Sequence, residues 1–259
     1  MSDFPRSMVP STPKVVPRPT FGPYVMLEAA PWLLLATVMR ARAKMLGDGA
    51  LLLVMLASEF VLFLAFLIAT QKMVERAGGI TSLGRLAMAD QLRLAGSAVW
   101  RLMLLFLCTV FASLVLGMNK QLAAGAWVGF DAIVYFWPLG WHPIWPALIA
   151  TLVFLFVIER GMERKPTARA AVGQMLRRWR HFIPAAAFIA LFLALMNRIQ
   201  PLAGDMVQLI ADQMSPGPMR NLLYIGFLFF FSYVRLLVTI TVLTFAARAS
   251  WRNDPAMSR

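Results

Sequence analysis

Three ionisable residues lie near the middle of long apolar stretches: Glu59, Asp131 and Arg235. An ionisable group at the bilayer centre costs at least about 2.5–3.5 kcal/mol on insertion scales, so it normally faces a bundle interior and finds a partner there. We expect Arg235 to pair with Glu59 or Asp131 and to hold helices together. Because two carboxylates face one arginine, one carboxylate would have no cationic partner and could titrate. A proton-coupled transport pathway needs such a group. If the apolar stretch around Asp131 does not span, that side chain lies in water instead.

The other residues of reactive type form no pattern that catalysis or metal binding needs. His142 and His181 lack a second His, Cys or carboxylate at the i, i+4 spacing of metal ligands. The sequence contains no G-x-S-x-G, P-loop or H-E-x-x-H motif. The single cysteine, Cys108, excludes a disulfide framework, and its thiol is expected to be inert inside an apolar run. The sequence therefore predicts a protein that is not an enzyme and that binds no metal or cofactor.

Composition places these residues in a membrane protein. The chain has 259 residues, of which 60% are apolar and 14% charged, and its mean hydropathy is +0.69. Soluble chains are about 45–50% apolar and about 25% charged, so a soluble domain is excluded, as is disorder over most of the chain. The net charge of +13 would indicate nucleic acid in a soluble protein. Here we interpret it as a topology signal and as contacts to anionic lipid, with no nucleic acid as partner.

The apolar segments predict an all-α, polytopic transmembrane helix bundle of about six spans. The predicted spans are 50–70, 102–118, 121–138, 144–158, 182–197 and 221–247. The 121–138 segment is ambiguous because Asp131 lies at its centre. We expect a single transmembrane domain over 24–250, between a basic proline-rich tail (1–23) and a short cytoplasmic tail (251–259).

Interfacial amphipathic helices are expected beside these spans. Residues 24–39 are apolar but shorter than the roughly 20 residues of a span, and Pro31 interrupts them. We interpret them as a helix lying on the membrane, with a spanning helix as the alternative. Residues 71–100 contain an amphipathic segment, and residues 201–214 predict an acidic amphipathic helix on the outer surface.

The distribution of basic residues predicts the orientation. The 160–181 stretch has the strongest positive signal and is expected in the cytoplasm, which places the acidic 199–219 loop outside and both termini inside. The same count places residues 71–101 outside, although that loop is itself basic. We expect the cytoplasmic basic residues to contact anionic lipid or an acidic partner. They are Arg164, Lys165, Arg169, Arg177, Arg178 and Arg180.

Two segments carry a family resemblance. Residues 167–195 form a basic amphipathic helix that leads into an apolar run, and residues 231–249 place an arginine mid-span close to the C-terminus. In span layout over roughly 50–250, the chain resembles bacterial six-span proteins such as the membrane domain of glycerophosphoryl diester phosphodiesterases and its stand-alone relatives. The soluble phosphodiesterase domain has no counterpart here, so the resemblance implies membrane location without catalytic activity. With no signal peptide evident in 1–23, we expect the bacterial inner membrane.

Two functions remain open at this point. The chain is expected to be a non-catalytic inner-membrane scaffold, assembly factor or membrane-domain partner, with the lipid bilayer and another membrane protein as its contacts. The alternative is a small transporter or channel component that uses the mid-membrane charges. A lipid enzyme would need polar residues clustered at the headgroup level, and only His142, Asp131 and Asn119 come close.

Overall fold

The described part of the chain is all helical, as expected. The computed structural model describes residues 26–43, 48–77, 88–117, 130–135, 143–161 and 167–252. The predicted tail over 1–23 lies outside these ranges, as do Arg164 and Lys165. Within them are seven α-helices and one 3-10 helix: α1 (Ala30–Ala43), α2 (Asp48–Arg76), α3 (Met88–Val115), η3 (Phe130–Ile133), α5 (Ile144–Gly161), α6 (Ala168–Arg177), α7 (Trp179–Asp212) and α8 (Pro218–Arg252).

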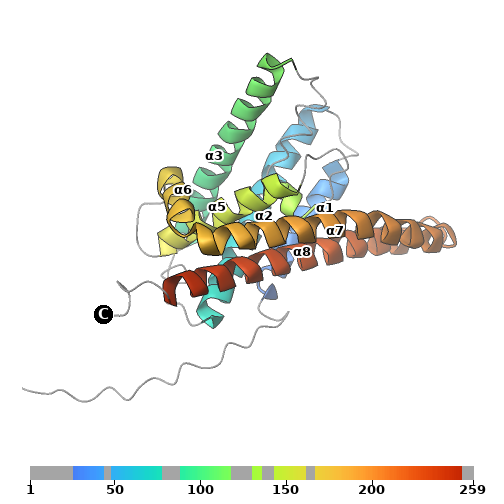
Figure 1. The fold of residues 1–259 in the computed structure, drawn as a ribbon. Helices are drawn as coiled ribbons and strands as arrows, with labels where there is room; N and C mark the ends of the chain where they lie inside the picture. Colours follow the sequence, from blue (N-terminus) through green and yellow to red (C-terminus); the bar gives the residue numbers. More distant parts are fainter. Residues whose placement is uncertain are drawn as a thin grey trace, which may run out of the picture.

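The arrangement is built on a long hairpin. Figure 1 shows α7 and α8 side by side along their whole length, with α1, α2 and α5 packed on one part of the hairpin and its turn extending beyond them. The short turn between Asp212 and Pro218 makes the two helices antiparallel. Helix α3 packs on α2 and then projects away from the bundle (Figure 1).

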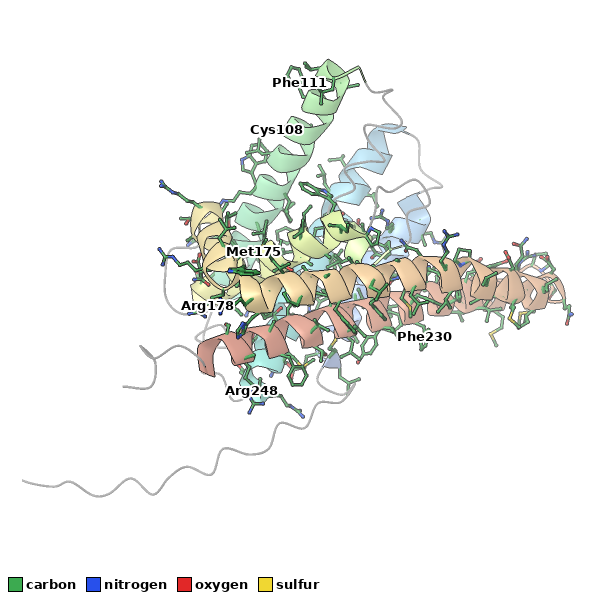
Figure 2. All side chains as sticks on the ribbon, viewed as in Figure 1. Cys108, Phe111, Met175, Arg178, Phe230 and Arg248 are labelled. Atoms are coloured by element: carbon green, nitrogen blue, oxygen red, sulfur yellow. The ribbon has the colours of Figure 1, made fainter. Side chains whose placement is uncertain are left out.

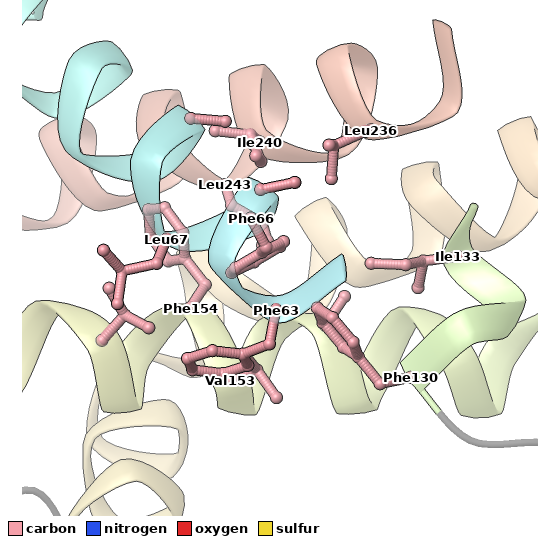
Figure 3. Packing of buried hydrophobic residues seen from close by; sticks show 14 of the residues in the cluster. Phe63, Phe66, Leu67, Phe130, Ile133, Val153, Phe154, Leu236, Ile240 and Leu243 are labelled. Atoms are coloured by element: carbon pink, nitrogen blue, oxygen red, sulfur yellow. The ribbon is translucent and has the colours of Figure 1, made fainter. Parts of the chain in front are cut away.

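The core lies where α1, α2, η3, α5 and α8 meet. Figure 3 shows Phe63 and Phe66 of α2 facing Phe130 of η3, with Leu236 and Ile240 of α8 beside them. The Phe66 and Phe130 ring centroids lie 5.1 Å apart at 78°, an edge-to-face contact that contributes about 0.5–1.5 kcal/mol beyond the area buried. Because lipid is as apolar as these side chains, close packing rather than exclusion of water holds such a core together in a membrane.

Three of the described helices are long and apolar enough to cross a membrane. They are Leu56–Arg76 within α2, Trp179–Asp212 (α7), and Pro218–Ser250 within α8. In α2, 67% of the apolar window is buried inside the protein, against 33% in α7 and in α8, so α2 is the central helix. The apolar part of α5, Ile144–Glu159, is shorter. Together these helices suggest a multi-pass membrane protein.

The structure corrects the interpretation of residues 182–214. The predicted span 182–197 and the predicted interfacial helix 201–214 form one continuous helix, α7, with Pro201 in its interior. A proline removes one backbone hydrogen bond, but membrane-spanning helices tolerate this loss where neighbouring helices and local adjustments satisfy the freed backbone groups. Packing does continue here, because a Cβ at Gly204 would lie 3.8 Å from the Phe227 ring of α8.

Of residues 24–39, which were expected to lie on the membrane surface, the structure describes 26–39, most of which belong to α1. Helix α1 packs along α2 and α8, and Leu33, Ala36 and Thr37 on one of its faces are buried. The Thr37 hydroxyl donates to the Leu33 carbonyl oxygen at 2.8 Å, which satisfies it inside the bundle. Helix α1 is therefore a member of the bundle.

The remaining predicted spans correspond to the described helices only in part. Most of 102–118 lies in α3, and 144–158 lies in α5. Of 121–138, the structure describes residues 130–135 alone, where the backbone forms the short η3. The structure does not show six spans.

Candidate functional site

Arg235 of α8 is fully buried and joins three segments of the chain. Its Nη2 donates to Asn197 Oδ1 at 2.9 Å and to Gln200 Oε1 at 2.8 Å, and its Nη1 donates to the Tyr135 carbonyl oxygen at 3.3 Å. Asn197 and Gln200 belong to α7, and Tyr135 follows η3. One guanidinium thus connects α8 to its hairpin partner and to the segment beyond η3.

The local sequence explains why these groups meet. Asn197 and Gln200 are three residues apart on α7, so both amides lie on one helix face. On α8 the buried polar residues Ser232, Arg235 and Thr239 recur at spacings of three and four, which gives α8 a polar stripe facing the interior. The hairpin aligns the amide pair with this stripe.

All the acceptors around Arg235 are uncharged. Among the side chains that the structure describes, which do not include that of Asp131, no carboxylate lies at ion-pair distance from its guanidinium, and its buried Nε has no hydrogen-bond partner. Hydrogen bonds from a charged donor contribute about 1.5–3 kcal/mol each, so the three acceptors offset part of the cost of burying this cation.

A charge pair lies close to Arg235. Arg40 of α1 lies 3.9 Å from Glu59 of α2, measured from Nη1 to Oε1, with 16% and 25% of the two side chains exposed. The Arg40 guanidinium also sits 4.5 Å from the centroid of the Tyr135 ring, a cation–π geometry. Tyr135 therefore contacts Arg40 through its ring and Arg235 through its carbonyl. We call these residues the arginine cluster: Arg40, Glu59, Tyr135, Asn197, Gln200 and Arg235.

The arginine cluster differs from the expected pairing. Glu59 pairs with Arg40, and the expected ion pair between Glu59 and Arg235 is not present. Asp131 lies in η3, four residues before Tyr135, and its side chain is outside the described part of the structure. The reason for the difference is tertiary: α1, expected on the membrane surface, packs beside α2 and brings Arg40 to Glu59.

Sequence reasoning missed four members of this cluster. In the sequence, Arg40 follows an apolar run and was interpreted as a basic residue flanking it. The acceptor at Tyr135 is a backbone carbonyl oxygen, which no side-chain pattern indicates. Asn197 and Gln200 did carry a signal, because two amides on one face of an apolar helix are natural partners for an arginine in the next span.

The basic residues around α6 lie at one end of the hairpin. The Thr167 hydroxyl caps α6 by accepting the Ala170 N–H at 3.2 Å, and Arg169 and Arg177 are exposed. Arg178 donates to Ser250 Oγ of α8 at 3.3 Å, and Figure 2 shows Arg178 and Arg248 at this same end. Arg180 is exposed and lies 5.8 Å from the Trp179 ring. These side chains form a surface that fits the predicted lipid contacts, and α6 is the basic amphipathic helix expected from residues 167 onward.

A cavity shows that two basic segments share one side of the bundle. Ala98 and Arg101 of α3 line it together with Ala168 and Ala171 of α6. The hydrocarbon core of a bilayer is about 30 Å thick, so segments that line one small cavity do not lie on opposite faces of it. Residues 98–101 and 168–171, which were expected on opposite sides of the membrane, therefore lie beside one another at this cavity.

Among the residues that the structure describes, no group of three or more His, Cys, Asp or Glu side chains is arranged to hold a metal ion. Cys108 is exposed on α3 (Figure 2), and His181 lies in the first turn of α7.

No family model matches the chain, and no curated protein or solved structure matches it either.

Proposed function

We propose that this protein is a non-catalytic, multi-pass scaffold of the bacterial inner membrane that holds a partner membrane protein. The observation that carries the proposal is the use of Arg235, whose buried charge joins α8 to α7 and to Tyr135. Three N–H donors of its guanidinium bond to acceptors in other segments of the chain. Such bonds favour a rigid framework over a moving transport pathway. The likeness in span layout to stand-alone relatives of the phosphodiesterase membrane domain agrees with such a role.

The turn end of the hairpin supplies a surface for the partner. Large apolar side chains are exposed there on both helices, beyond the part covered by the rest of the bundle: Leu202, Met206, Leu209, Ile210, Met219 and Leu222. Arg220 pairs with Asp212 at 2.8 Å across the turn and holds the two helices in register. A rigid apolar hairpin end suits docking against another transmembrane helix.

Affinity capture of the full chain from its native membrane tests this proposal. We expect a membrane protein to co-purify at fixed stoichiometry and to be lost when Leu202, Met206 and Leu209 are all changed to Ala. A matched control changes Phe188, Leu191 and Leu195, which are exposed on the earlier part of the same helix, and should retain the partner. Absence of a stoichiometric partner, or equal capture by both triple variants, would contradict the scaffold role.

For the topology we propose six spans, in which α1 replaces the expected span 121–138. Helices α1, α2, α3, α5, α7 and α8 cross the membrane, and residues 121–138 do not. The pairing of Lys72 with Glu28 at 2.9 Å supports this arrangement, because it makes α1 and α2 antiparallel. With α1 crossing, the basic segments 71–101 and 160–181 and both termini all lie in the cytoplasm, in agreement with the positive-inside rule.

One observation favours the second candidate function, a small transporter or channel component. Arg235 has only neutral acceptors and an unused buried Nε, so an anionic substrate would supply the missing counter-charge. Anion flux into proteoliposomes tests it. A transporter predicts flux that falls with Arg235→Gln and is partly kept with Arg235→Lys, compared at equal amounts of folded protein in the proteoliposomes. A scaffold predicts no flux above that of empty liposomes.

A further inference from the structure

A cavity of about 350 Å³ lies between α3, α5 and α6. It falls in the 300–1,000 Å³ range typical of sites for small ligands. Leu102 and Cys108 of α3, Ile149 and Phe156 of α5 and Val172 of α6 form much of its wall. Figure 1 shows α3 projecting away from the rest of the bundle, and the small residues Ala98 and Ala171 are part of the cavity wall. The wall is almost entirely carbon, so it suits an apolar chain.

A positively charged side chain lies beside this apolar cavity. Among the described residues that line the cavity, Arg101 is the one with an ionisable guanidinium, and this group lies 4.9 Å from the centroid of the Phe156 ring. The contact with the ring holds the exposed guanidinium beside the cavity. Arg169 on α6 adds a second exposed positive charge, next to the lining residue Ala168. A ligand that matches both features has an apolar chain and an anionic head.

The position along α3 indicates where such a ligand comes from. Before Arg101 the helix carries Asp90 and Arg93, whereas no charged residue follows it to the end of the helix at Val115. Trp100 beside it is exposed, as is Trp179 next to Arg180. Tryptophan and arginine at the start of an apolar run are typical of the headgroup level of a bilayer. Leu104, Leu107 and Phe111 continue the apolar exposed surface of α3 toward the membrane interior.

We infer that this cavity binds one acyl chain of an anionic phospholipid from the surrounding bilayer, with the phosphate held by Arg101. The site is separate from the arginine cluster and from the hairpin end. The inference goes beyond the proposed scaffold role and holds whether or not a partner protein binds.

Cys108 makes the inference testable, because it lines the cavity and is the chain's single cysteine. The full chain is purified in a neutral maltoside detergent, and the rate at which a maleimide labels Cys108 is measured with dioleoyl phosphatidylglycerol or dioleoyl phosphatidylcholine added. We expect phosphatidylglycerol to slow labelling at lower concentrations than phosphatidylcholine. Arg101→Gln should weaken the protection by phosphatidylglycerol about fivefold and leave that by phosphatidylcholine unchanged.

Two matched variants on α6 separate the cavity from the general surface. Val172→Trp places a large ring in the cavity and should abolish protection by phosphatidylglycerol. Leu176→Trp lies on the same helix, 61% exposed and outside the lining, and should behave like the unmodified chain. Bound phosphatidylglycerol counted by native mass spectrometry should follow the same order.

Three results would overturn the inference. Equal protection by the two lipids, unaffected by Arg101→Gln, would show that charge plays no part. Phosphatidylglycerol binding unchanged in Val172→Trp would show that the chain does not enter this cavity. Protection by oleate but not by phosphatidylglycerol would identify a free fatty acid as the ligand in place of a membrane phospholipid.

Discussion

Arg235 shows how a single buried cation can be held by amide oxygens in place of a carboxylate. The donors at Nη1 and Nη2 reach Tyr135, Asn197 and Gln200, so removal of any one acceptor leaves a buried charge with fewer partners. Each such loss typically costs about 1–3 kcal/mol. This identifies the amide pair on α7 as the residues on which the position of Arg235 depends most directly.

We therefore predict that Gln200→Leu lowers the stability of the purified protein by about 1–3 kcal/mol. The double-mutant cycle of Arg235→Leu with Gln200→Leu should show a coupling of about 0.5–3 kcal/mol, whereas Arg235→Leu with Glu59→Leu should be nearly additive. Thermal unfolding in detergent measures both cycles. Gln208→Leu, an exposed glutamine on the same helix, is the control and should change little. A larger coupling to Glu59 than to Gln200 would contradict the observed geometry.

At the scale of elements, the distinctive feature is the continuity of α7 through Pro201. Phe188 and Met206 are both exposed and lie 18 residues apart on this helix, so spin labels at the two positions should be separated by about 27 Å in backbone rise. Double electron–electron resonance in a Cys108→Ala background measures this separation. A helix that ends near Pro201 and folds onto the membrane surface would give a clearly shorter distance. A label pair at Arg180 and Arg198, which are both exposed, also 18 residues apart and both before the proline, provides the reference for an unbroken helix.

At the scale of the whole molecule, the gathering of basic segments at one end of the bundle predicts the topology. Reporter fusions at residue 170 and after residue 250 should report the cytoplasm, and a fusion at residue 208 should report the outside. A fusion after Ala77 decides between the two arrangements of six spans, because it reports the cytoplasm if α1 crosses the membrane and the outside if 121–138 crosses. A cytoplasmic signal at residue 208 would contradict both.

Composition and local pattern were enough to predict several features of this protein. The high apolar content predicted an all-α membrane protein, the basic residues around α6 predicted an amphipathic helix entering α7, and Arg235 was identified as a buried charge in need of partners. These follow from local physics, because lipid tolerates only backbones that satisfy their own hydrogen bonds and seldom tolerates isolated charges.

Which groups contact one another depends on how the helices pack. Packing of α1 against α2 brought Arg40 to Glu59, and the hairpin set Asn197 and Gln200 against Arg235. Packing against α8 also continues beyond Pro201, where α7 remains one helix, although proline is a stop signal in the sequence. The shared cavity brought residues 98–101 beside α6. Each outcome depends on contacts between residues far apart in the chain, and such contacts have no period or local motif that a single sequence displays.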